Sequence, residues 1–333
     1  MRTDVTFPSG SLALAGHLYA PDDETDGPWP AIVVGHPASG VKEQAAGLYA
    51  ERLARQGFAV LTFDAAFQGE SEGEPRGLED PAHRIEDIKA AVSFLSVRDG
   101  IDAERIGALG ICASGGYVIP ASATDHRIRA VATVSAVDLG RHFREGGDGQ
   151  QDPAVIQGML EEAAAARTAE AGIEGTPRLP LFAGGEEHAR AGLRSQPGVS
   201  AALGRYLFEG WEYYCTDRGQ HPRSAKSMPW SSVDRIASFD AFRFIAFIAP
   251  RPLLMIVGRE AATSYMTSEA FWHAREPKEI FWIDGATHVA LYDKDEYVTP
   301  AIAKLSSFFH THLTRTTRDR TRNVMNAPVR IRT

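Results

Sequence analysis

Cys112 has the sequence surroundings of a reactive residue, because it directly follows an apolar run and stands among small residues. Residues 106–111 have the character of a buried strand, and Ala-Ser-Gly-Gly follows the cysteine. Small residues around such a position let a strand and the next helix approach closely, which lifts the side chain above the sheet and directs nearby amides at it. The pattern predicts a thiol nucleophile on a sharp turn from strand to helix.

The same stretch also fits a frame in which Ser114 occupies the turn. The apolar run ends at Ile111, however, so Cys112 is the first residue beyond it, and Ser114 falls in the first turn of the helix that carries Tyr117. Cys112 is therefore the preferred nucleophile. A cysteine that only fills space is the remaining alternative, since free cysteine is among the most buried residue types.

His288 is the favoured base among eleven histidines, because it lies just after the last expected strand. A loop there falls at the same sheet edge as the turn of Cys112, and the chain order nucleophile, acid, histidine suits this arrangement. An imidazole with a pKa of about 6.5 can take the thiol proton and later return it to a leaving group. The histidines left as structural or solvated are His142, His188, His221 and His310.

Two carboxylates compete for the role of orienting this imidazole. Glu260 follows the expected strand 252–257 and is the only acid there before Glu269, whereas Asp138 stands at the end of the expected strand 128–137. A carboxylate in either place would hold the tautomer and stabilise the imidazolium. Glu260 is preferred, Asp138 is the alternative, and a surface role for Glu260 stays open.

Chemistry at an acyl carbonyl also needs donors for the oxyanion. The amide of Ala113 directly follows the nucleophile, and the loop 36–40 after an early strand should supply a second donor. Pro37 has no N–H, so Ala38 is the better candidate. His36 is expected either to shape the substrate pocket or to hydrogen-bond within its loop.

Apolar strands alternate with helical segments along the chain, which predicts an α/β fold with a mostly parallel central sheet covered by helices on both faces. Asp80 is expected to cap a helix that begins at Pro81. The expected strands are 31–34, 59–63, 106–111, 128–137, 252–257 and 278–283, after a hairpin of 5–8 and 12–20; the expected helices are 42–56, 81–99, 268–275 and one that opens at 299–300.

Residues 139–239 interrupt this alternation and contain an Ala-rich helical pattern. About 100 residues are too many for an ordinary loop, so we predict a largely helical cap over the carboxyl ends of the strands, where open α/β sheets bind ligands. The core then comprises residues 1–138 and 240–314. Aromatic residues of the cap are expected to pack it onto the core or to line the pocket, with Trp211 and Tyr214 as candidate substrate contacts; the cluster is Trp211, Tyr213, Tyr214 and Trp230.

Composition excludes several classes of function. The net charge of -8 argues against a nucleic acid partner, and no run approaches the roughly 18 apolar residues of a membrane helix. Cys112 and Cys215 have neither a metal-binding nor a disulfide spacing, and Met1 opens no signal peptide, so a cytoplasmic setting is expected. Without a dinucleotide or zinc motif we expect no cofactor and no metal. The arginine-rich residues 315–333 are expected to be a flexible tail, or alternatively an arm against a partner subunit in a homodimer.

Three motifs together resemble the α/β-hydrolase superfamily, in particular its dienelactone-hydrolase-like branch and the related fungal polyketide transferases and thiohydrolases. The motifs are Gly-Ile-Cys-Ala-Ser-Gly-Gly at 110–116, His-Pro-Ala-Ser-Gly-Val-Lys-Glu-Gln at 36–44 and Gly-Ala-Thr-His at 285–288, within a likeness that spans about 5–313. The resemblance implies a triad of Cys112, Glu260 and His288. Departures are Ser114, where glycine is common, and Ala261 and Ala262, where such enzymes often place an aspartate.

A cysteine nucleophile makes an acyl-enzyme that is itself a thioester, so hydrolysis and acyl transfer can share one site. We therefore expect a hydrolase or acyltransferase that acts on a small-molecule ester, lactone or thioester. Because fold alone does not establish catalysis, two alternatives remain. The first is a catalytically silent member of the fold that binds a small molecule, and the second is a lyase-type reaction at the same site.

Overall fold

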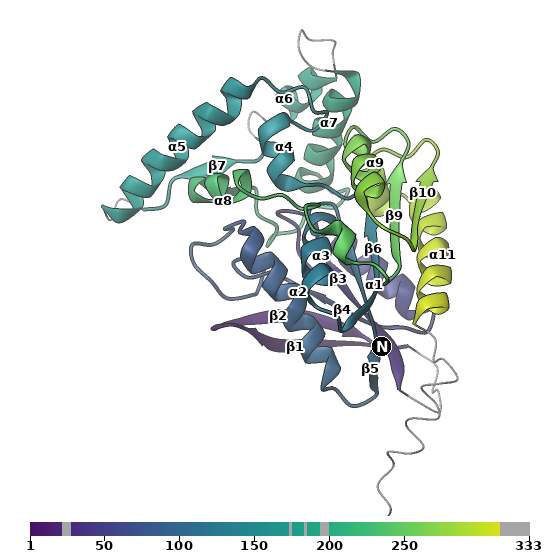
Figure 1. Ribbon diagram of the computed structural model, residues 1–333. Helices are drawn as coiled ribbons and strands as arrows, with labels where there is room; N and C mark the ends of the chain where they lie inside the picture. The colour runs from purple at the N-terminus through teal and green to yellow at the C-terminus, as the bar shows by residue number, and fades with distance from the viewer. Residues whose placement is uncertain (22–27, 173–174, 183–184, 194–199, 314–333) are drawn as a thin grey trace, which may run out of the picture.

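An eight-stranded sheet forms the centre of the computed structural model (Figure 1), with the strand order β1-β2-β4-β3-β5-β6-β9-β10. Strands β4 to β10 in this order run parallel, whereas β1 and β2 form an antiparallel hairpin that joins β4. The predicted mostly parallel sheet is confirmed. The strands are β1 Arg2–Ser9, β2 Leu12–Tyr19, β3 Trp29–Gly35, β4 Ala59–Phe63, β5 Ile101–Ile111, β6 Ile128–Val134, β9 Leu253–Gly258 and β10 Lys278–Ile283.

The structure describes most of the chain, and the expected tail 315–333 lies outside the described residues. Every residue of β4 and β9 is buried, because helices cover both faces of a parallel sheet. The described ranges are 1–21, 28–172, 175–182, 185–193 and 200–313.

Two groups of helices flank the sheet. Helices α1, α10 and α11 contact one another, and α2 packs against α3 in front of the sheet in Figure 1. The helices of the core, including α9, have the following bounds: α1 Ala45–Ala54, α2 Pro81–Ser96, α3 Ala113–Thr124, α9 Ser264–His273, α10 Ala290–Asp293 and α11 Asp295–His312.

The helix α2 begins where its capping residue predicts, whereas the last helix, α11, begins earlier than expected. Asp80 caps α2 as predicted, since its carboxylate accepts a hydrogen bond from the Ala82 amide. The last helix begins at Asp295 rather than at Thr299, and Pro300 lies inside it. Acidic residues in its first turn favour the earlier start, because they interact well with the positive end of the helix dipole.

The described part of residues 139–239, which we call the cap, lies over the carboxyl ends of the parallel strands (Figure 1). The helix α4 follows β6 and contacts both α5 and α8, while α6 packs along α7. A two-stranded ribbon of β7 and β8 joins these helices. The elements are α4 Leu139–Glu145, α5 Pro153–Ala171, β7 Arg178–Pro180, α6 Gly185–Gly192, α7 Ala201–Cys215, β8 Ser227–Pro229 and α8 Val233–Ala237.

Cys112 occupies the turn that joins β5 to α3. Its backbone has φ 55° and ψ -119°, a left-handed conformation that side chains rarely adopt. Such strain persists only where the surroundings enforce it, and it is common at functional sites. The strand and the helix meet so closely that a Cβ atom on Gly110 would lie 2.1 Å from the Ser114 carbonyl oxygen.

Replacing Gly110 with alanine should therefore destabilise the protein by at least about 2 kcal/mol, since backbone rather than a flexible side chain must move. Gly158→Ala is the matched control, because a Cβ there meets no atom within 4 Å and the residue lies in α5. That control should stabilise the protein by about 0.5–1 kcal/mol. Urea unfolding measures both changes, and equal effects at the two glycines would contradict the expected close approach.

Candidate active site

The Cys112 thiol lies at the carboxyl edge of the sheet, surrounded by three hydrogen-bond donors. Burial raises the pKa of the thiol above its usual value, and hydrogen bonds from the Tyr292 hydroxyl and from the amides of Ala113 and Ala38 oppose this rise. The two amides come from different elements, the start of α3 and the loop after β3. They converge on the sulfur, so a negative charge that develops beside it would meet two N–H groups.

The loop after β3 begins with a buried histidine, His36, whose hydrogen bonds hold the loop in place. The Nδ1 atom of His36 lies 2.7 Å from the Pro37 carbonyl oxygen, and its Nε2 atom accepts a hydrogen bond from the Ala65 amide at 3.1 Å. Burial, followed by the nearby Arg84 guanidinium, holds the pKa of His36 well below its usual value. Of the two roles expected for His36, the structure shows hydrogen bonding within the loop and places the ring away from the cavity wall.

Ser114 also hydrogen-bonds to the loop after β3. Its hydroxyl donates to the His36 carbonyl oxygen at 2.6 Å and accepts from Arg84 Nη2 at 3.2 Å. The side chain is 2% exposed and lies in the first turn of α3. The turn between strand and helix is therefore occupied by Cys112, and the frame with Ser114 at the turn does not match the structure.

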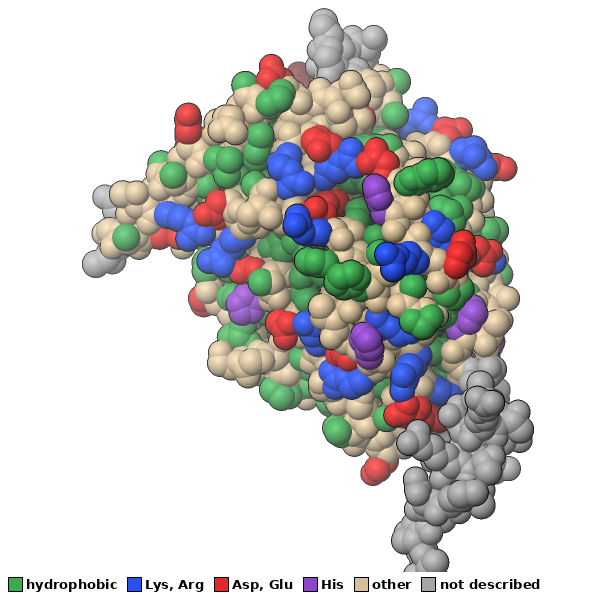
Figure 2. Space-filling model, in the orientation of Figure 1, with side chains coloured by type: hydrophobic (Ala, Val, Ile, Leu, Met, Phe, Trp, Pro, Cys, Tyr) green, Lys and Arg blue, Asp and Glu red, His purple; other side chains and the backbone are tan. Residues whose placement is uncertain are grey.

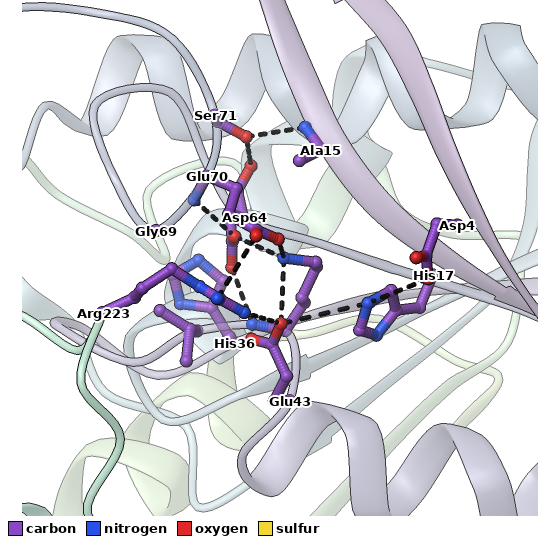
Figure 3. Close-up of polar contacts among 12 residues, drawn as sticks. Asp4, Ala15, His17, His36, Glu43, Asp64, Gly69, Glu70, Ser71 and Arg223 are labelled. Atoms are coloured by element: carbon purple, nitrogen blue, oxygen red, sulfur yellow. Dashed lines mark hydrogen bonds and ion pairs between the residues drawn. The ribbon is translucent and has the colours of Figure 1, made fainter.

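Farther along, the same loop is attached to the end of β4 by a buried ion pair. Lys42 donates from its backbone N–H to one oxygen of Asp64 and from Nζ to the other, each at 2.8 Å. Glu70 accepts from the same ammonium at 2.6 Å, and Arg223 from the cap binds both Glu70 and Glu43 (Figure 3). Because the partners satisfy one another, the pair fixes the loop that carries the Ala38 amide.

His288 follows β10 and is almost fully enclosed, with 1% of its surface exposed. Its Nδ1 atom lies 2.7 Å from the Thr263 hydroxyl, and its Nε2 atom lies 3.0 Å from the Tyr292 hydroxyl. Burial, with a smaller contribution from His142, lowers the pKa of His288 to about 3. The imidazole is therefore neutral at pH 7.

The structure brings neither of the expected carboxylates to this imidazole. The Glu260 carboxylate is half exposed and pairs with Arg205 of α7 at 2.8 Å, because the turn after β9 directs it toward solvent. Asp138 instead caps α4 and accepts from the amides of Arg141 and Ala241. In place of a carboxylate, the neutral hydroxyl of Thr263, at the start of α9, contacts Nδ1.

A cavity of about 420 Å³ lies between the cap and the Cys112 thiol. Trp211 and Tyr214, the two expected substrate contacts, both line it. The Tyr214 hydroxyl also donates to the Ala38 carbonyl oxygen at 3.3 Å, which connects the cap to the loop after β3. Apolar side chains make up most of the remaining wall; they include Val137, Leu139, Phe143, Leu181, Phe182, Leu207, Met228 and Val289.

Part of the cavity wall is polar. Glu79 and Gln68 are among its lining residues, and the Glu79 carboxylate accepts from the Tyr117 hydroxyl at 2.8 Å and pairs with Arg84 at 3.2 Å. The other two expected cap aromatics have packing roles. Tyr213 packs edge-on against Tyr214 and Tyr292. Trp230 packs against a small hydrophobic cluster that includes buried residues of α5.

Several residues of the site carried little signal in the sequence. Tyr292 stands four residues after His288, a spacing that places two side chains on one side of a helical turn. His142, treated above as structural or solvated, lies on the cavity wall, where burial lowers its pKa to about 4. Tyr206 of α7 packs edge-on against the His288 ring at 5.0 Å. Thr263 gave no signal, because only the fold brings the loop after β9 to the histidine.

Within the described ranges, no group of three or more His, Cys, Asp or Glu side chains is arranged to hold a metal ion. No helix in the described part of the chain is long and apolar enough to cross a membrane. On the face shown in Figure 2, acidic and basic side chains are interspersed rather than collected into a basic stripe of the kind that follows a nucleic acid backbone.

Residues 10–197 match the family described as X-Pro dipeptidyl-peptidase (S15 family), a match that covers more than half of the chain. The chain belongs to this family. The S15-family chain is 35% identical over 319 residues to the uncharacterised protein YcjY of Escherichia coli K12, with 94% of this chain and 100% of YcjY covered. It is 34% identical over 316 residues to the uncharacterised protein PA2218 of Pseudomonas aeruginosa, with coverage of 93% and 80%.

Solved structures agree with this assignment. The crystal structure of PA2218 superposes with a TM-score of 0.83 over 94% of each chain at 33% identity. The α/β hydrolase GrgF from Penicillium superposes with a TM-score of 0.76, over 94% of this chain and 99% of GrgF, at 21% identity, which shows the fold alone. The solved structures confirm the α/β-hydrolase fold expected from the sequence, and membership of a peptidase family confirms the expected hydrolase class.

Several relatives bear the name of an activity. The thiohydrolase aneE of Aspergillus aculeatus is 39% identical over 219 residues, which cover 66% of this chain and 59% of aneE.

Proposed function

We propose that the chain is an acyl hydrolase or acyltransferase that uses Cys112 as its nucleophile and acts on thioesters or similarly activated esters and lactones. One observation carries the proposal: the Cys112 thiol opens into the cavity while the amides of Ala113 and Ala38 converge on its sulfur. This arrangement suits attack on a carbonyl group whose oxygen becomes negatively charged.

In the proposed reaction, the Cys112 sulfur bonds to the carbonyl carbon and the thiol proton is transferred to His288 Nε2. The amides of Ala113 and Ala38 stabilise the oxyanion. The carbonyl then reforms, the bond to the leaving group breaks, and the imidazolium proton is transferred to that group. Water, or another nucleophile, next attacks the acyl thioester and releases Cys112 as a thiol, with His288 again accepting and returning one proton.

The neutral character of the site supports activated acyl groups as substrates. Burial raises the pKa of Cys112 and lowers the pKa of His288, so the resting pair is a thiol and a neutral imidazole. Thr263 supplies no negative charge to stabilise an imidazolium. A thiolate leaving group departs with little help from an acid, whereas an amine needs full protonation. The peptidase activity in the family's description is therefore not carried over to this chain.

The shape and chemistry of the cavity support an apolar acyl chain. A volume of about 420 Å³ falls within the range of small-molecule pockets, about 300–1,000 Å³. The names of two relatives, the thiohydrolase aneE and the acyltransferase drtE from two Aspergillus species, support acyl chemistry at this site.

A trapped acyl adduct tests the proposal. The protein is exposed briefly to aryl thioesters of increasing chain length, quenched in acid, and analysed by intact and peptide mass spectrometry. We expect an adduct on Cys112 that is absent from Cys112→Ala and retained in Cys215→Ala, the matched control at the only other cysteine. An adduct on Ser114 would move the nucleophile. Neither adduct nor turnover at any chain length would favour the silent binding protein, and product without incorporated solvent oxygen or acyl transfer would favour the lyase.

A further inference from the structure

Tyr292 stands between the proposed nucleophile and the proposed base. Its hydroxyl is hydrogen-bonded to Cys112 and lies 3.0 Å from His288 Nε2. Among the described residues, the two ring nitrogens of His288 contact Thr263 and Tyr292, and no hydrogen bond joins the imidazole directly to the thiol. A proton that leaves the sulfur for the imidazole therefore meets the phenol oxygen on its way.

The lining of the cavity gives a second, independent indication that Tyr292 stands between the Cys112 thiol and the His288 imidazole. Cys112 and Tyr292 both line the cavity, whereas His288 is not among its described lining residues. The rings of Tyr206 and Tyr292 pack edge-on against the imidazole, with centroids 5.0 and 5.6 Å away. A leaving group or a water molecule in the cavity thus reaches the Tyr292 hydroxyl before it can reach the imidazole.

Packing fixes the position of this hydroxyl. The Tyr292 ring is buried and meets the Tyr213 ring edge-on at 5.2 Å. Its backbone amide donates to the Val289 carbonyl oxygen, and the neighbouring Leu291 carbonyl accepts from the buried Tyr49 hydroxyl at 2.7 Å. Burial raises the pKa of Tyr292 well above its usual value, so the phenol keeps its proton at neutral pH. A fixed, protonated hydroxyl between two groups can donate to one while it accepts from the other.

We propose that the Tyr292 hydroxyl relays protons between Cys112, the acyl leaving group and His288, a role that rests on the proposed Cys112 chemistry. During attack, the thiol proton is transferred to the phenol oxygen as the phenol proton is transferred to His288 Nε2. During collapse, Nε2 returns its proton to the phenol oxygen as the phenol donates to the departing sulfur or oxygen. The relay uses the tautomer in which Nδ1–H donates to the Thr263 hydroxyl, so that Nε2 is free to accept.

Removing the hydroxyl tests the relay. In Tyr292→Phe, the single-turnover rate of Cys112 acylation by an aryl thioester should fall about 10²-fold, while half-saturation changes less than about 3-fold. Rates measured across mixtures of H₂O and D₂O should curve for the wild type, because two protons move together, and should become linear in the variant. A merely structural role for Tyr292 would not change the shape of this dependence.

Two further proteins keep the test decisive. Tyr213→Phe removes a buried hydroxyl from the ring packed against Tyr292, and it should retain both the rate and the curvature. Incorporation of 3-fluorotyrosine at position 292 preserves the ring and the hydroxyl but lowers the phenol pKa, so it should change the rate even if Tyr292→Phe does not fold. Wild-type rate and curvature in Tyr292→Phe would overturn the relay alone, whereas a wild-type protein without a Cys112 adduct would overturn the proposed function as well.

Discussion

Replacing Cys112 with alanine is expected to lower thioester turnover at least about 10³-fold, because the covalent route disappears. The amides of Ala113 and Ala38 remain, so the residual rate should still exceed that of the uncatalysed reaction. Alanine fits the space left by the sulfur at this buried turn, so the far-ultraviolet circular dichroism should not change. Steady-state rates with one thioester series check the prediction.

Cys112→Ser tests whether a hydroxyl can replace the thiol as the nucleophile. A hydroxyl is far harder to deprotonate than a thiol, and the neutral Thr263 cannot support an imidazolium beside it. We therefore expect Cys112→Ser to be nearly as inactive as Cys112→Ala, while Cys215→Ala stays within about 2-fold of the wild type. Full turnover in Cys112→Ala would exclude Cys112 as the nucleophile.

His288→Ala should reduce kcat/KM by about 10²–10⁴-fold, since His288 is the base that contacts the Tyr292 hydroxyl among the described residues. Glu260→Ala is the matched control that separates this structure from the arrangement expected from sequence. Its carboxylate pairs with Arg205 at the surface, so its removal should change kcat/KM less than about 3-fold. Equal losses in the two variants would show that Glu260 reaches the imidazole during turnover.

The pH dependence of kcat/KM should reflect the lowered pKa of His288. In the proposed reaction the neutral imidazole of His288 is the base, and its pKa of about 3 means that protonation should not reduce kcat/KM until the pH falls far below 6.5. Thr263→Asp would place a carboxylate beside Nδ1 and raise the pKa of His288, so the acid limb should move to higher pH. Thr263→Val, which removes the hydrogen bond without adding charge, should show no such upward movement.

Much of the core could be predicted because its signals are local. The strands β4 and β10 have the expected bounds, since short apolar runs between turn residues leave few alternatives. The Asp80 cap depends on residues two positions apart. Cys112 could be placed on its turn for a similar reason, because the steric demand for small neighbours falls on residues adjacent in sequence.

The partners of His288 could not be predicted in this way. The sequence favoured Glu260 because it is the acid nearest the end of β9, but the turn there directs the carboxylate to Arg205 and brings Thr263 to Nδ1 three residues later. A side chain's direction within a turn depends on backbone dihedrals and on tertiary packing, neither of which residue type reveals.

The sequence by itself determined the alternation of strands and helices and the sharp turn at Cys112, because each depends on neighbours along the chain. Only the tertiary structure decided that Thr263 replaces a carboxylate, that Tyr292 separates the thiol from the imidazole, and that the cap closes a largely apolar cavity over them. These features join segments far apart in sequence. Their geometry depends on how helices and loops pack across the sheet edge, where a shift of about 1 Å changes which groups can exchange a proton.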